Sequence, residues 1–161
     1  MFTAIWQYQA GVLIALTMAA ALFAWQRGAG PERACAGVLA AMVLEGLLTR
    51  FTGSMPLTEG QIDGGQLLTD LAATGGLALV ALRANRLYPL ALAALHLVVL
   101  SAHLVRGLSP GLAAEAHAIM SGVPRWLEVL VLIAGIAAHR RRLRRIGPYR
   151  NWRLVEIPGA Q

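Results

Sequence analysis

The chain has 161 residues, of which 57% are hydrophobic and only 14% are charged, and its mean hydropathy is +0.60. A water-soluble fold of this length needs a charged shell that these residues do not supply. The net charge of +6 comes from arginines gathered toward the C-terminus, which argues against nucleic acid as a partner. The composition therefore predicts an all-α, polytopic transmembrane helical bundle in contact with the lipid bilayer.

The first apolar segment, residues 7–25, has the length of a membrane span, because its helix would extend roughly 28 Å. Trp6, Tyr8 and Trp25 lie at its ends, where interfacial aromatic rings are expected. No basic residue occurs before it, whereas a secretory signal begins with positive charge, so we expect a retained span. The following segment, 26–33, contains two glycines, a proline and two arginines and predicts a basic link.

Three more spans are predicted at residues 34–49, 67–82 and 88–105. A polar, glycine-rich segment, 50–66, separates the second span from the third. The third and fourth spans are joined by a short basic turn at 83–86. Each of these links is too polar to lie in the hydrocarbon core, so the chain is predicted to cross the bilayer repeatedly.

After the fourth span, Ser109 and Pro110 form a capping pair that predicts a short helix ending near Met120. This helix would be about 18 Å long, too short to cross a bilayer, so we place it at the interface. A fifth span is predicted from about residue 121 to 138. The chain then divides into a transmembrane domain, 1–139, and a basic tail, 140–161.

All fourteen basic residues are arginines, and eleven of them occur at three places: the link after the first span, the turn at 83–86, and the tail. Arg50, Arg106 and Arg125 stand singly at the opposite ends of the spans. Short basic loops remain cytoplasmic when bacterial membrane proteins insert. We therefore predict a multi-pass protein of a bacterial inner membrane, with a periplasmic N-terminus and a cytoplasmic C-terminus.

Ionisable residues inside membrane spans are costly and are the first candidates for a functional site. Glu45, Asp70, His103 and Glu128 are expected in the outer half of the membrane at similar depth, close to Arg125. His96 is expected nearer the midplane. Together they predict one intramembrane polar cluster, made of Glu45, Asp70, His96, His103 and Glu128.

Several interpretations of this cluster remain open. It could hold the bundle together by ion pairs, with Glu128 paired to Arg125 three residues earlier. It could carry protons or ions, with His96 passing them to the carboxylates. A metal, haem or pigment site is a third interpretation, although His96 and His103 share one helix face and cannot both ligate a single haem axially. Contact with a separate subunit is a fourth.

The sequence offers no catalytic, cofactor-binding or metal-binding residue to which we assign a role. Its one cysteine, Cys35, lies in an apolar segment without a neighbouring base, so we expect a packing residue and not a nucleophile. We therefore do not expect an enzyme or a bound cofactor.

The basic tail follows the fifth span directly. Each arginine near an anionic leaflet contributes on the order of 1 kcal/mol to attraction, and a tryptophan beside them would lie at headgroup depth. An acidic cytoplasmic partner is the alternative ligand. The residues expected to contact lipid headgroups or such a partner are Arg140, Arg141, Arg142, Arg144, Arg145 and Trp152.

Four segments, 28–33, 83–90, 103–111 and 139–152, resemble parts of an uncharacterised family of small alphaproteobacterial multi-span inner-membrane proteins. These motifs are turns and basic stops, so the resemblance implies an inner-membrane location and carries over no functional residue. From size, small-residue helix faces and the missing reactive constellation, we expect a non-enzymatic accessory or scaffolding subunit of a larger membrane assembly. The alternative is a small proton- or ion-linked transporter or channel that uses the polar cluster.

Overall fold

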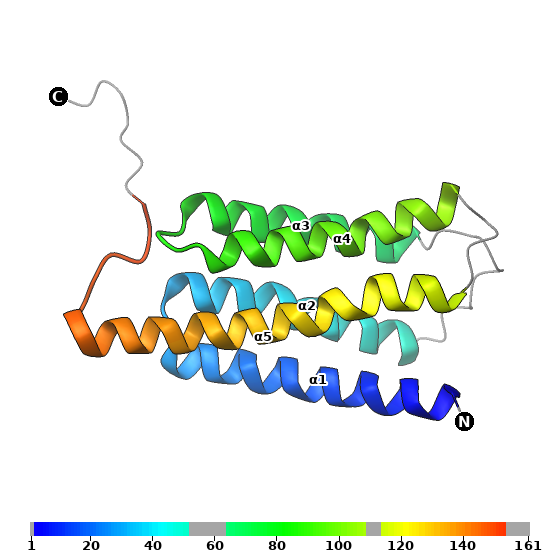
Figure 1. Ribbon diagram of the computed structural model, residues 1–161, viewed down its shortest axis with the longest axis horizontal. Helices are drawn as coiled ribbons and strands as arrows, with labels where there is room; N and C mark the ends of the chain where they lie inside the picture. Colours follow the sequence, from blue (N-terminus) through cyan, green and yellow to red (C-terminus); the bar gives the residue numbers. More distant parts are fainter. Residues whose placement is uncertain (1, 52–63, 109–113, 154–161) are drawn as a thin grey trace, which may run out of the picture.

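The computed structural model describes residues 2–51, 64–108 and 114–153, and within these ranges it contains helices and no β-strand (Figure 1). This confirms the predicted all-α transmembrane bundle. The helices are α1 (Phe2–Arg27), α2 (Gly30–Phe51), α3 (Gly64–Arg83), α4 (Tyr88–Leu108) and α5 (Ala114–Ile146). Most of the segment expected to link the second and third spans lies outside the described residues.

Within the described part of the chain, four helices contain a segment long and apolar enough to cross a membrane. The segments are Tyr8–Arg27, Gly64–Arg83, Tyr88–Val105 and Ile119–Ile146. The remaining helix, α2, has 22 residues but carries Glu32, Arg33 and Glu45, and it is not one of the four. It packs against α1, α3 and α5, and a fifth crossing at α2 stays a prediction.

The helices alternate in direction along the long axis of the molecule (Figure 1). α1 packs on α2, α3 packs on both α2 and α4, and α5 packs on α4, α1 and α2. The α1–α2 link, the α3–α4 turn and the C-terminus of α5 consequently lie at one end, at the left of Figure 1. We call this the basic end, because Arg27, Arg83 and the arginines of 140–145 lie there.

The link between α1 and α2 is shorter than expected, since only Gly28 and Ala29 lie outside the helices. Pro31 occupies the first turn of α2, where its missing N–H breaks no helical hydrogen bond. The carboxylate of Glu32 accepts a hydrogen bond of 3.1 Å from the Ala29 N–H, which caps the helix. The predicted start of the second span at residue 34 was therefore late by one turn.

A separate short helix ending near Met120 was a wrong prediction for the described residues. From Ala114 onward these residues form the first turns of α5, which continues through Pro124 without a break. One proline removes a single hydrogen bond, whereas ending a helix in an apolar environment would free several backbone groups. Residues 110–113 lie outside the described part of the chain.

An apolar layer fills the middle of the bundle. Its centre is made of Leu77, Leu92, Leu132 and Ile136, none of which has exposed surface. Close packing here depends on Gly135, because a Cβ at that position would lie 2.7 Å from the ring of Tyr88. The layer separates the two polar clusters that are described below.

The chain does not change character at residue 139, where a tail was expected to begin, because α5 continues to Ile146. Gly147, with a φ of +76°, then ends the helix, and its N–H donates a 3.0 Å hydrogen bond to the Leu143 carbonyl. Residues 147–153 return to the basic end, where backbone hydrogen bonds of 3.1 Å and 2.8 Å join the segment 151–153 to the α3–α4 turn. The Trp152 indole lies against Gly30, where a Cβ would approach its Nε1 to 2.6 Å.

Candidate functional site

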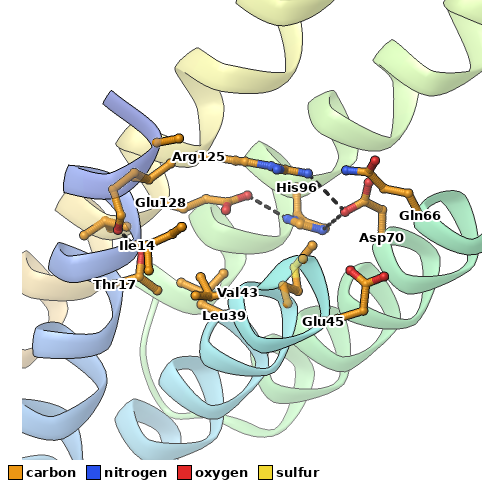
Figure 2. Close-up of a pocket in the computed structure, with 15 residues that line it drawn as sticks. Ile14, Thr17, Leu39, Val43, Glu45, Gln66, Asp70, His96, Arg125 and Glu128 are labelled. Carbon is orange, nitrogen blue, oxygen red and sulfur yellow. Dashed lines mark hydrogen bonds and ion pairs between the residues drawn. The ribbon is translucent and has the colours of Figure 1, made fainter. Parts of the chain in front are cut away.

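Asp70 is the centre of a buried polar cluster in the half of the bundle away from the basic end (Figure 2). Its carboxylate has no exposed surface and faces three basic side chains. His103 Nε2 lies 2.7 Å from Oδ2, while His96 Nε2 and Arg125 Nη2 lie 3.5 Å and 3.6 Å from Oδ1. Because a lone carboxylate is costly in an apolar interior, these contacts are what allow Asp70 to be there.

His96 joins two carboxylates, one on each side of its ring (Figure 2). Nδ1 lies 2.8 Å from Glu128 Oε1, and Nε2 faces Asp70. The Nδ1 contact is a hydrogen bond, whereas Nε2 forms no hydrogen bond and approaches Asp70 only as a looser contact. From α4, the ring therefore contacts α3 through Asp70 and α5 through Glu128.

The cluster ties three helices together, since Asp70 lies on α3, both histidines lie on α4, and Arg125 and Glu128 lie on α5. We name these five side chains the acid–histidine cluster. The predicted pairing of Glu128 with Arg125 is replaced by contacts between helices: Glu128 faces His96, and Arg125 faces Asp70. The side chains of Arg50 and Arg106 lie outside the described residues.

A cavity of about 160 Å³ opens beside the acid–histidine cluster. All five helices line it, and its walls are largely apolar, with Leu13 and Ile14 from α1 and Leu39 and Val43 from α2 (Figure 2). A volume of this size corresponds to about five water molecules or one small organic group. The polar wall is formed by Glu45, Gln66, Asp70, His96, Arg125 and Glu128.

Glu45 was expected in the polar cluster, and the structure places it on the wall of the same cavity. Within the described residues, no hydrogen bond or ion pair joins it to Asp70, His96 or Glu128. It is half-buried, whereas Asp70 and His96 are fully buried. Glu45 is therefore the acidic group of the cavity that is available to a bound ligand.

A second buried polar cluster closes the basic end, and its members show no common pattern in the sequence. The Arg86 guanidinium forms an ion pair with Glu32, whose side chain has no exposed surface. Arg86 Nη2 also donates hydrogen bonds of 2.6 Å to Asn151 Oδ1 and 3.1 Å to His139 Nδ1, and the guanidinium stacks over the Tyr149 ring at 5.3 Å. We name Glu32, Arg86, His139, Tyr149 and Asn151 the Arg86 cluster.

Two features of the Arg86 cluster define its chemistry. Burial lowers the pKa of the Arg86 guanidinium, but arginine stays protonated at physiological pH, so the ion pair with Glu32 persists. His139 Nδ1 accepts from Arg86 and lies 2.8 Å from the Tyr149 hydroxyl, so this nitrogen carries no proton. The cluster thus joins α2, the α3–α4 turn, α5 and the segment 147–153.

The tail residues expected at lipid headgroups do not share one environment. Arg140, Arg141, Arg144 and Arg145 line a groove with Phe23 of α1. Arg142 instead stacks on Tyr149 at 5.0 Å, and Trp152 packs on Gly30 with 40% of its surface exposed. Cys35 is buried and free, as expected of a packing residue.

Within residues 2–51, 64–108 and 114–153, no group of three or more histidine, cysteine or acidic side chains could hold a metal ion. Comparison of the chain with protein-family models, with curated proteins and with solved structures gave no match. The resemblance to alphaproteobacterial inner-membrane proteins stays a prediction. Functional inference therefore depends on the two clusters, the cavity and the helix surfaces.

Proposed function

We propose that this protein is a non-enzymatic accessory or scaffolding subunit of a larger assembly in a bacterial inner membrane, with its basic end in the cytoplasm. The orientation is supported by eleven of fourteen arginines, which lie in or within a few residues of the α1–α2 link and the α3–α4 turn, or in the C-terminal part of the chain. Labelling from intact cells tests it in a Cys35→Ala background. Asn85→Cys should be protected and Ser54→Cys reactive, and the reverse pattern would refute the orientation.

The observation that supports a subunit role is the outward position of small-residue pairs. Lipid gives no hydrophobic drive between helices, so small residues four apart are a common means of close helix contact. In α1, Ala15 and Ala19 are exposed, and so are Gly37 and Ala41 in α2. The chain does not use these pairs for its own packing, which leaves them for a partner or a second copy.

Gly37 and Gly75 offer a matched test of this role. Both are exposed glycines, and a Cβ at either would meet nothing within 4 Å. Gly37 has a small residue four positions later, whereas Gly75 is flanked at that spacing by Leu71 and Leu79. Gly37→Leu should therefore dissociate the native complex in gently solubilised membranes, while Gly75→Leu should not. Purification of the unaltered protein only as a monomer without a partner would refute the proposal.

A second candidate function is proton- or ion-linked transport. The observation that favours it is a cavity lined by ionisable side chains. The cavity gives Glu45 and the acid–histidine cluster a shared space that can hold water. The apolar layer between the two clusters would have to open for conduction, as in alternating access. Flux in proteoliposomes tests this function. Unchanged flux in both the Glu45→Gln variant and the Glu45→Gln/Asp70→Asn double variant would exclude this transport function.

A further inference from the structure

A groove with a strongly positive wall lies between α1 and α5 at the basic end. Its volume is about 390 Å³, and Arg140, Arg141, Arg144 and Arg145 line it with Phe23 and Ala137. Residues three or four positions apart are neighbours on a helix, so Arg140 and Arg144 form one row and Arg141 and Arg145 a second row beside it. All four line the groove and form one cationic surface. The Arg140 guanidinium lies 5.5 Å from the centre of the Phe23 ring, which turns this surface toward α1.

The positive charge of the groove has no internal counterion in the described part of the chain. None of its four arginines forms an ion pair with an acidic residue among residues 2–51, 64–108 and 114–153. Other arginines of the basic end do have partners, since Arg86 pairs with Glu32 and Arg142 stacks on Tyr149. Four like charges on one face repel one another, so an anionic ligand would be stabilised there.

The groove also lies at the depth of lipid phosphates. The apolar segment of α5 begins at Ile119, and its helix covers roughly 31 Å before Arg140, about the thickness of the hydrocarbon core. Arg140 to Arg145 then extend into the headgroup region. The groove floor is apolar, through Phe23 and Ala137, and exposed Leu22 and Ile133 continue the apolar surface of α1 and α5.

We propose that this groove is a specific site for the headgroup of an anionic phospholipid, with highest affinity for a lipid that carries two phosphates, such as cardiolipin. Guanidinium groups bind phosphate oxygens in pairs, so four of them suit two phosphates. The acyl chains would lie along the apolar surfaces of α1 and α5. The site is independent of the subunit role and of the acid–histidine cluster.

The test is a titration of the detergent-solubilised full chain with lipid, followed by native mass spectrometry. The apparent Kd should be lowest for cardiolipin, higher for phosphatidylglycerol, and beyond measurement for phosphatidylcholine. The variant Arg141→Gln/Arg144→Gln should bind cardiolipin roughly 25-fold more weakly, because each arginine contributes about fivefold. The control Arg83→Gln/Arg150→Gln removes the same charge outside the groove and should change the Kd by less than about threefold.

Three results would overturn the proposal. Equal weakening in the two double variants would mean that only net charge attracts lipid. Equal binding of phosphatidylcholine would mean that the groove holds bulk lipid through its apolar surface. Displacement of cardiolipin by an equal concentration of inorganic pyrophosphate would identify a free anion, and not a lipid, as the ligand. All four substituted arginines are solvent-exposed, so both variants should keep the unfolding midpoint of the unaltered protein.

Discussion

Removing the guanidinium of the Arg86 cluster should destabilise the protein far more than removing any neighbouring arginine. In Arg86→Met, the apolar stem is kept, but Glu32 loses its ion-pair partner at a position without solvent exposure. The same change removes hydrogen bonds of 2.6 Å to Asn151 and 3.1 Å to His139. A carboxylate left buried without a partner is the dominant cost.

The expected loss for Arg86→Met is about 3–5 kcal/mol in the free energy of unfolding. Glu32→Gln keeps an acceptor for the Ala29 N–H and removes the buried charge, so it should rescue part of that loss. The double variant should therefore be at least about 2 kcal/mol more stable than the sum of the two single effects predicts. Arg83→Gln is the control, because its side chain is exposed in the same turn.

Equilibrium unfolding in mixed micelles, driven by sodium dodecyl sulfate and followed by circular dichroism, measures these differences. Hydrogen exchange adds a local test, since Arg86→Met should expose the Arg153 amide, which donates to the Arg83 carbonyl. If the losses in unfolding free energy for Arg86→Met and Glu32→Gln were strictly additive, the proposed coupling between these two side chains would be refuted. So would a loss for Arg86→Met no larger than the loss for Arg83→Gln.

Three further predictions concern other parts of the bundle. Asp70→Asn should lower the free energy of unfolding by about 3–5 kcal/mol, because His103 and Arg125 lose the carboxylate they face and His96 loses one of its two. Glu45→Gln should have little effect in the same micelle assay. Gly135→Ala should lower the free energy of unfolding by about 1–3 kcal/mol, since its Cβ would lie 2.7 Å from the Tyr88 ring. Gly75→Ala, with open space around it, should be neutral or stabilising in thermal unfolding. Cys35 is fully buried, so maleimide should label it only after denaturation, and rapid labelling in mild detergent would show that α2 is not packed in the bundle.

The helical architecture could be predicted from the sequence because membrane spans depend on local properties, which are length, hydropathy and the residues that flank them. Helix boundaries are harder to predict where one residue type can either begin a helix or lie inside it. A proline near a glycine can lie at the start of a helix or inside one, and Pro31 and Pro124 illustrate the two cases. Pro31 lies in a first turn, where Glu32 caps the helix, while Pro124 lies inside α5.

Of the candidate site, the sequence identified the acidic and histidine side chains but not their pairing. The depth of each side chain along its helix follows from its position in the sequence. The rotation of each helix and the identity of its neighbours do not, and this rotation places Arg125 against Asp70 and not against Glu128. The Arg86 cluster was missed for a different reason. Glu32 and Arg86 were assigned to loops, where charge is ordinary, and the residues between them in sequence give no sign of the contact. A Glu placed directly after Pro31 was the one local signal available.

The hydrogen bonds that join residues 151–153 to the α3–α4 turn have a consequence for biogenesis. Synthesis proceeds from the N-terminus, so Glu32 and Arg86 are made before Tyr149 and Asn151. Until then the guanidinium lacks the partners that Tyr149 and Asn151 later provide. The Arg86 cluster can therefore close only after α5 has been made, because Tyr149 and Asn151 follow that helix in the chain.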